Sequence, residues 1–499
     1  MKSSTNYTTN YTTFSEIKQM KLFNAFYYQI ENGDPVLELI NILEGLDLTE
    51  FKKLFQYKRK INPIRLLAVV IYAYSRKITS LIEIETYCKE NIKFKYLLDS
   101  APAPDYTTIS KFMKKCENVL DDIFIQFNRR ILEKQNINTK SIYIDGTKLE
   151  AYANRYTFVW KKTIIKNREK NNVKIKELIS EFNSYYDMNL INLEEIINYL
   201  LSKNIEMVKG KGKRKSFEQK LLERSLSFFE KNEEYEKHLN IMGDRNSYSK
   251  TDNDATFMRM KDDYMNNGQL KPGYNLQIGV CSELIIGFKV FSNPTDINTL
   301  IPFLDLLIDK GYELNNIVAD AGYESLVNYE YLEKNNLNSY IKPQNYEQSK
   351  SRTFKNDLNR IDNLVYYEEK NELSRKDGLI FEYIEDKKIK GINYKIFRNP
   401  ETDKLVKFNF KFREYSKRSR ENIDSKLGKK LRLNRSIQVE GAFAVIKENM
   451  KVRKLKVKGK KSVNRELTFI MMGYNFKTYM NKIKNNKKGE ILHKIKELA

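Results

Sequence analysis

The sequence contains few of the side chains that support nucleophilic catalysis or disulfide frameworks. Among 499 residues there are two histidines, His238 and His493, and three cysteines, Cys88, Cys116 and Cys281. The cysteines lie far apart and form no CxxC pair, which excludes a disulfide framework and argues against a cysteine-based zinc site. Both histidines lie in polar, lysine-containing sequence and are expected on the solvated surface. Hydrolytic chemistry would therefore use carboxylates with a metal, or another nucleophile.

Long apolar runs are also missing. No stretch reaches the 18 or so apolar residues of a membrane-spanning helix, and the first residues, MKSSTNYTTNYTTF, lack the apolar core of a signal peptide. We therefore expect a soluble, cytoplasmic protein with no membrane partner. The hydrophobic fraction of 41% is ample for a packed core, and the length suggests two to four structural units.

The charge is strongly asymmetric. There are 89 Lys and Arg against 65 Asp and Glu, which gives a net charge of +24. Such an excess favours a polyanionic partner, with nucleic acid first and a membrane surface second. The alternative is a merely basic cytosolic protein, whose heavy use of lysine would reflect an AT-rich genome.

Residues 15–137 have the apolar periodicity of short helices, with Pro63 at the start of a strong run and Asp105 or a following Thr placed to cap a later helix. In a basic protein these helices fit a helix-turn-helix-like DNA-binding unit and a plain helical bundle equally well. Residues 161–247 also read as helix, with a basic stretch at 209–215. A hairpin is expected over 273–291 with its turn at Cys281–Glu283, followed by a helix over 296–310.

Two aspartates follow short apolar runs of high β-propensity. Asp145 precedes a glycine at the end of Ser141–Ile144, and Asp320 follows Asn316–Ala319. We therefore expect each at the carboxyl end of a strand, where functional groups of open sheets gather. A turn-forming aspartate is the common alternative for either residue alone.

A third acid, Glu440, lies on a predicted helix that resumes near Arg435. Glu440, Phe443 and Lys447 share one face, and Lys447 lies about 10 Å along the axis from Glu440. That spacing fits a carboxylate on a metal and an ammonium on a neighbouring phosphate, although an ordinary amphipathic helix is favoured by this segment alone. The adjacent apolar stripe consists of Val439, Ala442, Ile446 and Met450.

Four parts of the sequence together carry a family resemblance. The first is residues 143–151 with 156–161, the second is residues 249–256 with 271–275, and the third is residues 319–325. The fourth is the pair Glu440 and Lys447, which six residues separate. The chain resembles the DDE transposases of bacterial insertion sequences. Within them it is most similar to the insertion-sequence-four-like branch, group eleven-eighty-two, with an InsH-type N-terminal domain. The resemblance covers most of the chain.

The resemblance implies an α/β protein with an RNase-H-like catalytic core, an N-terminal all-helical domain, a helical insertion and a β-rich insertion. The β-rich insertion contains four β-like runs, at Leu364–Glu368, Leu379–Ile384, Ile392–Phe397 and Leu405–Phe412. The implied boundaries are 1–137 for the N-terminal domain, 138–160 with 248–345 and 430–485 for the core, 161–247 and 346–429 for the insertions, and 486–499 for a basic tail.

The resemblance also implies a catalytic triad of Asp145, Asp320 and Glu440. In such a triad the carboxylates hold two Mg²⁺ ions, for which Mn²⁺ can substitute. Lys447 and Arg435 would bind DNA phosphates, although Arg435 stands five positions before Glu440 rather than the family's four. Trp160 and Tyr156 are candidates for stacking on an unpaired base, with core packing as the favoured alternative.

The implied activity is metal-dependent phosphodiester hydrolysis and strand transfer at the terminal inverted repeats of a mobile element. The implied partners are double-stranded DNA, as transposon ends and target, and a second copy of the chain on the paired ends. The alternative is a catalytically silent, transposase-derived DNA-binding protein.

Overall fold

A computed structural model describes residues 30–55, 60–99, 101–210, 214–260, 268–389, 391–491 and 493. The helical prediction for 15–29, the middle of the basic stretch at 211–213 and most of the predicted tail beyond 491 lie outside these residues.

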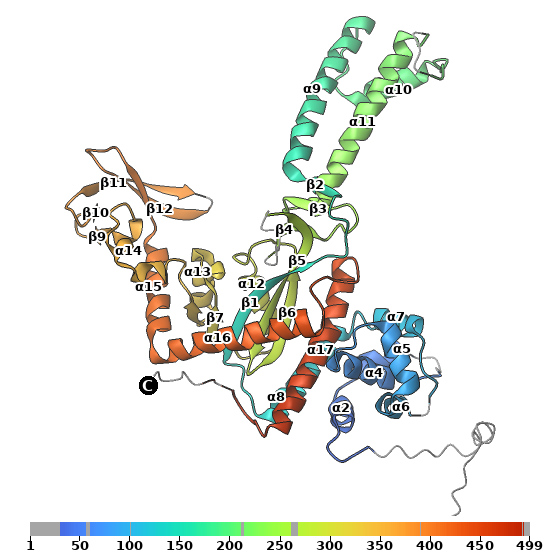
Figure 1. Ribbon diagram of the computed structural model, residues 1–499. Helices are drawn as coiled ribbons and strands as arrows, with labels where there is room; N and C mark the ends of the chain where they lie inside the picture. The colour runs from blue at the N-terminus through green and yellow to red at the C-terminus, as the bar shows by residue number, and fades with distance from the viewer. Residues whose placement is uncertain are drawn as a thin grey trace, which may run out of the picture.

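A mixed six-stranded sheet forms the centre of the molecule (Figure 1). Strand β5 pairs antiparallel with β1 on one side and with β4 and β6 on the other, and β1, β7 and β8 run parallel. The fold is therefore α/β, as expected. The strands are β1 (Ser141–Glu150), β4 (Thr256–Arg259), β5 (Leu270–Cys281), β6 (Leu284–Phe291), β7 (Asn316–Ala319) and β8 (Asn338–Ile341).

The predicted hairpin is confirmed as β5 and β6. Its two turn residues, Ser282 and Glu283, both have positive φ angles, of 50° and 69°. Positive φ at both central positions is the geometry of the two-residue turn whose twist matches that of the flanking strands. The hairpin extends along β1 and gives that strand a long antiparallel neighbour.

The prediction that a strand ends at Asp145 is wrong. Strand β1 continues for five more residues, because Gly146 pairs with Gln277 in the ladder and the pairing runs on to Glu150 opposite Gly273. Asp145 therefore lies in the middle of a strand. The corresponding prediction for Asp320 is confirmed, since β7 ends at Ala319.

Two helices at the C-terminal side of the chain cover the sheet. Helix α16 (Lys426–Ala444) packs against β1, β5 and β7, while α17 (Lys460–Lys484) packs against β6 and the helices α4 and α8. The apolar stripe predicted on α16 is buried. Gly473 of α17 allows close approach to α4, because a Cβ there would lie 2.6 Å from the Cβ of Tyr74.

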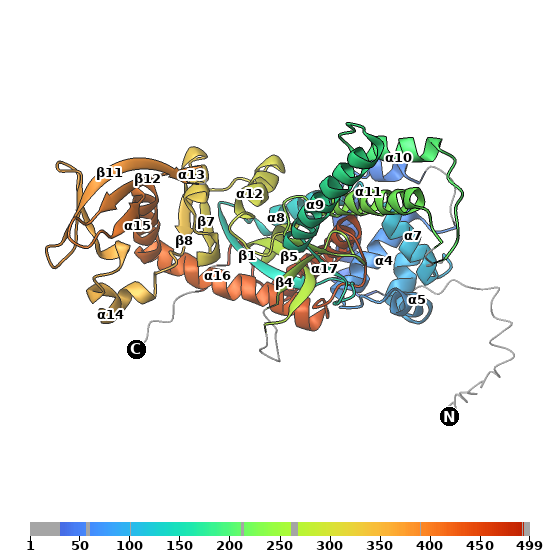
Figure 2. The ribbon, with the colours of Figure 1, turned by 90° about the horizontal axis from the view of Figure 1, so that it is seen from above.

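The N-terminal helices lie beside α17 (Figure 2). Asp105 caps α7 as predicted, since its carboxylate accepts a hydrogen bond from the Thr108 amide at 2.6 Å. The helices are α2 (Pro35–Glu44), α3 (Thr49–Lys53), α4 (Pro63–Ser75), α5 (Leu81–Glu90), α6 (Ile92–Leu98), α7 (Tyr106–Lys115) and α8 (Leu120–Gln135).

A helical arm projects away from the sheet (Figure 1). It consists of α9 (Lys161–Tyr186), α10 (Leu193–Ser202) and α11 (Phe217–Met242), joined at its base by the short strands β2 (Phe158–Trp160) and β3 (Ser247–Ser249). The arm has its own apolar cluster around Phe182 and Leu200. His238 at its base is not solvated as expected, because Nδ1 lies 2.6 Å from the Tyr248 hydroxyl and the side chain is 13% exposed.

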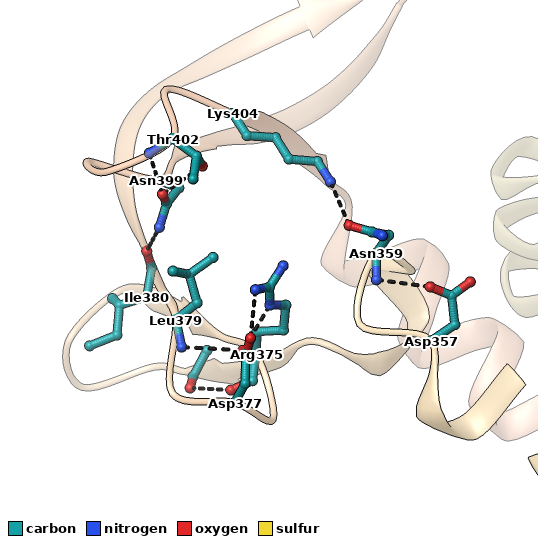
Figure 3. A network of polar contacts seen from close by, with 10 residues as sticks. Asp357, Asn359, Arg375, Asp377, Leu379, Ile380, Asn399, Thr402 and Lys404 are labelled. Carbon is teal, nitrogen blue, oxygen red and sulfur yellow. Dashed lines mark hydrogen bonds and ion pairs between the residues drawn. The ribbon is translucent and has the colours of Figure 1, made fainter. Parts of the chain in front are cut away.

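Between β8 and α16 the chain forms a second, five-stranded antiparallel sheet. Polar side chains hold its turns (Figure 3): the Asn399 amide donates to the Ile380 carbonyl, while its oxygen accepts from the Thr402 amide. The strands are β9 (Val365–Tyr367), β10 (Glu372–Ser374), β11 (Ile380–Ile389), β12 (Ile392–Arg398) and β13 (Leu405–Phe408).

Three predicted boundaries need correction, two in this region and one before it. The strand expected over Leu405–Phe412 ends at Phe408, because Asn409 accepts a hydrogen bond from the Phe412 amide and caps α15 (Phe410–Asp424). Helix thus resumes well before Arg435, and Ser425 caps α16 directly afterwards. Likewise the helix expected over 296–310 begins later, as α12 (Leu300–Asp309).

The remaining helical segments are the 3-10 turn η2 (Ala321–Tyr323), α13 (Leu326–Lys334), the 3-10 turn η3 (Gln348–Lys350), α14 (Arg352–Asn356), the 3-10 turn η4 (Ile361–Asn363) and the π-helical turn η5 (Val445–Asn449). In the described part of the chain, no helix combines the length and apolar character needed to cross a membrane.

Glu466 is a buried acid in α17. Its side chain is enclosed with the residue only 7% exposed, its Oε2 has no hydrogen-bond partner among the described residues, and burial raises the pKa of its carboxyl. A carboxyl whose pKa is higher in the folded state stabilises the fold below its unfolded pKa. That contribution is lost as the pH rises through the folded pKa.

We therefore expect Glu466→Gln to become progressively more stable relative to the natural protein between about pH 4 and about pH 8. Denaturant unfolding of both proteins at the two pH values measures the difference, in which all shared titrations cancel. A difference in unfolding free energy that stays constant with pH would contradict the prediction.

Candidate active site

Asp145 and Asp320 lie on neighbouring parallel strands. The register pairs Ser141 with Asn316 and Tyr143 with Val318. Continued by two residues, it aligns Asp145 with Asp320. Adjacent strands are about 4.8 Å apart, and residues in register on parallel strands point to the same face. The two carboxylates are therefore side by side, although 175 residues separate them in the sequence.

Arg435 of α16 lies over this pair. Its Nη1 is 3.3 Å from Oδ2 of Asp145, and the two side chains are 11% and 16% exposed. The contact is an ion pair without hydrogen-bond geometry, because Nη1 is buried and has no hydrogen-bond acceptor among the described residues. Arg435 is thus held against Asp145 by charge, with Nη1 enclosed by the surrounding residues.

A third aspartate, Asp296 in the loop between β6 and α12, lies beside the same two strands. Its Oδ1 accepts hydrogen bonds from the side-chain amides of Asn275 and Gln277, both at 2.8 Å. It approaches Gly146 and Gly322 closely: a Cβ at Gly146 would lie 2.6 Å from Oδ1, and one at Gly322 would lie 3.6 Å from Oδ2. Sequence reasoning did not place Asp296 in the site. The signal available was a glycine close behind each aspartate: Gly146 directly after Asp145, and Gly322 two residues after Asp320.

The pKa of Tyr323 reflects the charges of this cluster. Tyr323 is buried and donates a hydrogen bond to the Gln277 amide oxygen. Burial raises the pKa of Tyr323 well above its usual value, and the carboxylates of Asp296, Asp145 and Asp320 raise it further, while Arg435 opposes them. The carboxylates thus outnumber the guanidinium among the charges that act most strongly on Tyr323.

Glu440 differs from the two aspartates in its exposure to solvent. It is exposed on α16, five residues after Arg435, which is about 7.5 Å along the helix axis and well over a quarter-turn around it. Lys447 follows further along the chain, in the π-helical turn η5, where the Met450 amide donates a hydrogen bond to the Val445 carbonyl. Among the described residues, no three Asp, Glu, His or Cys side chains form a ready metal-binding group.

The two aromatic candidates differ in exposure. Trp160 packs against Phe158 and Phe257, with ring centroids 6.0 Å and 6.1 Å away. Tyr156 is 77% exposed in the loop between β1 and β2. Tyr156 is therefore the more exposed of the two, while Trp160 is partly buried.

Comparison with known proteins identifies two domains. Residues 245–476 match the family model described as a transposase DDE domain, and residues 24–115 match one described as a transposase domain (DUF772). The first match runs from β3 to Phe476 in α17 and includes both sheets except β1, so that β1 with Asp145 precedes it. No curated protein and no solved structure matches the chain.

Two parts of the chain are therefore similar to transposase domains, and together the two matches support a transposase. A DDE domain implies an RNase-H-like core, which agrees with the mixed sheet around β1. It also implies DNA as the partner and divalent metal ions as the usual cofactor of the family. The branch within the transposases stays a prediction.

A substitution at Gly146 tests how closely the side chains around Asp296 are packed. In Gly146→Ala the new methyl group would overlap the Gln277 amide and crowd Asp296. We expect a loss of about 1–3 kcal/mol in unfolding free energy, the usual range for overpacking. The matched control is Gly441→Ala on α16, where a Cβ meets nothing within 4 Å.

The unfolding free energy of the control should rise by about 0.5–1 kcal/mol, because alanine is favoured over glycine inside a helix. Denaturant unfolding of the two variants measures both effects. Equal stabilities for the two alanine variants would show that the clearance at Gly146 is not required by the fold.

Proposed function

We propose that this protein is a transposase that hydrolyses phosphodiester bonds and transfers strands at the terminal inverted repeats of a mobile element. The observation that carries the proposal is the register of β1 and β7, which aligns Asp145 with Asp320 under Arg435 in a chain with a transposase DDE domain. We propose Asp145, Asp320 and Glu440 as the catalytic carboxylates. The branch implied by the resemblance, group eleven-eighty-two, is part of the same proposal.

The residues present fit a hard divalent cation. Carboxylate oxygens are the ligands that Mg²⁺ prefers, with Mn²⁺ as a substitute, and the cluster carries more negative than positive charge. Oδ1 of Asp320 accepts from the Ala321 amide, and its Oδ2 has no hydrogen bond to any residue that the structure describes. Asp145 and Asp320 would hold the cation, with Glu440 completing the ligand set. A pair of such ions supplies charge stabilisation to both the attacking and the leaving oxygen of a phosphoryl transfer.

The chain's own cations would position the DNA. Arg435, which lies against Asp145, would donate to a non-bridging phosphate oxygen near the scissile bond. Lys447, further along the same helical segment, would neutralise a neighbouring phosphate. The exposed Tyr156 is the better placed of the two aromatic residues for stacking on an unpaired base.

The proposed partner is double-stranded DNA, bound as transposon ends and as target by a homodimer on the paired ends. The alternative remains a catalytically silent DNA-binding protein derived from a transposase. The two are separated by a strand-cleavage assay with Mg²⁺ on the terminal repeats of the element, because a silent protein binds those ends without cutting them.

Asp320→Asn should abolish cleavage and leave DNA binding unchanged or slightly tighter. The amide keeps the hydrogen bond to Ala321 but loses the charge that holds a divalent cation, while binding depends on cations elsewhere. The matched control is Asp309→Asn, an exposed acid on α12. A gel shift and a cleavage assay on the same DNA measure both properties. Near-normal cutting by the Asp320 variant would remove this residue from the mechanism.

Glu440→Gln should also lose cleavage while retaining its fold, because the side chain is exposed and packs in no core. The control is Glu421→Gln, an exposed acid on the neighbouring helix α15. We expect a loss of at least a hundredfold in cleavage rate at saturating Mg²⁺ for the first variant, equivalent to about 3 kcal/mol, and no change for the second. If both variants cut equally well, the third carboxylate must be sought elsewhere.

A further inference from the structure

The segment between η5 and α17 carries a dense row of cations. Five of the eight residues from 451 to 458 are basic, and all five are exposed. We call them the cationic strip: Lys451, Arg453, Lys454, Lys456 and Lys458.

Apolar residues fix this segment to the body of the protein. Val452 and Leu455 are buried, Leu455 with only 1% exposure, so that apolar side chains point inward while the basic ones point outward. The backbone is also held, because the Glu150 amide donates to the Arg453 carbonyl at 3.1 Å and the Leu455 amide donates to the Glu150 carbonyl at 2.8 Å. The strip is therefore attached to the end of β1, the strand that carries Asp145.

The charge of the strip is not neutralised locally. Glu150 is the acid at its centre, yet three cations share that carboxylate: Arg155 at 3.0 Å, Lys454 at 3.6 Å and Lys271 at 3.7 Å. Glu448 pairs with Arg453. Three acids, Glu150, Glu448 and the buried Glu466 near Lys456, thus face seven basic residues, which are the five of the strip together with Arg155 and Lys271. This surplus of positive charge is the complement of a phosphate backbone.

The strip connects the catalytic sheet to the N-terminal helices. The Lys456 ammonium donates to the Thr79 hydroxyl at 3.2 Å. Beside it, a groove of about 340 Å³ is lined by Lys456 and Val457 on one side and by Tyr106 and Ser110 of α7 on the other. A duplex lying along the strip would therefore contact both transposase domains.

The distance between the strip and the acids determines which part of the duplex the strip would contact. Glu150 follows Asp145 by five residues of continuous strand, which is about 17 Å at 3.3 Å per residue. Phosphates on one strand of a duplex recur every 3.4 Å of helix axis. For a duplex whose axis runs along β1, a separation of about 17 Å corresponds to about five base pairs.

We propose that the cationic strip binds the phosphate backbone of the DNA duplex about five base pairs from the scissile phosphate. In this way it sets the position of the transposon end along β1. The proposal rests on the proposed function, because the distance is counted from Asp145. It adds a binding surface that lies apart from the three carboxylates and from Arg435.

The test is the salt dependence of DNA binding by the full-length protein. The strip variant is Lys451→Gln, Lys454→Gln and Lys458→Gln together, which leaves the Lys456 contact with Thr79 intact. The control removes the same three charges as Lys370→Gln, Lys388→Gln and Lys407→Gln. These exposed lysines belong to the small sheet, which Figures 1 and 2 show on the opposite side of the central sheet from α17.

Each phosphate contact contributes about 0.9 to the slope of log affinity against log salt concentration, so the strip variant should lose about 2–3 from that slope while the control keeps the natural value. Protection of the duplex from hydroxyl radicals should also disappear about five base pairs from the cleavage position. An unchanged slope overturns the proposal, and so does an equal loss in both variants, since that would reflect net charge alone. If the natural protein binds no DNA, the proposed function fails instead.

Discussion

Strand β1 is hydrogen-bonded along its length to β5 and, through its first residues, to β7, and the rest of the structure depends on this double pairing. The parallel register with β7 determines that Asp145 has Asp320 as its neighbour. A shift of one residue would move one carboxylate to the opposite face of the sheet. The antiparallel pairing with β5 places Gln277 opposite Gly146 and so creates the space into which Asp296 fits. The far end of the same strand anchors the cationic strip.

The carboxylates near Tyr323 can lie close together because neutral amides and a cationic guanidinium offset the repulsion between their charges. The amides of Asn275 and Gln277 hold Asp296, and Arg435 lies against Asp145. Such an arrangement retains an excess of negative charge in a partly buried place, which is costly without a cation. The positive charge on the outer surface near β1 is of opposite sign to this centre. A phosphate backbone would be attracted by the surface cations, while the acids would need divalent ions to accept the scissile phosphate.

Several features could be read from sequence because their signals are local. The hairpin of β5 and β6, the end of β7 before Asp320, the cap at Asp105 and the buried stripe of α16 follow from alternation, turn residues and helical spacing. The errors arose where a local signal has two structural outcomes. Gly146 appeared to end a strand, but a glycine inside a ladder provides room for a neighbouring side chain instead. Asn409 was read as part of a strand, although its side chain caps a helix.

The sequence by itself determined the class of chemistry: with two histidines and no paired cysteines, the candidates for a catalytic site were carboxylates, and a basic chain indicated a polyanionic partner. It also identified Asp145, Asp320 and Glu440 as separate candidates. Only the tertiary structure decided that the strand register brings Asp145 and Asp320 next to each other, that Asp296 joins them, and that residues 453 and 455 are attached to the end of β1. These relations depend on strand register and on contacts between residues more than a hundred positions apart, which local periodicity does not encode.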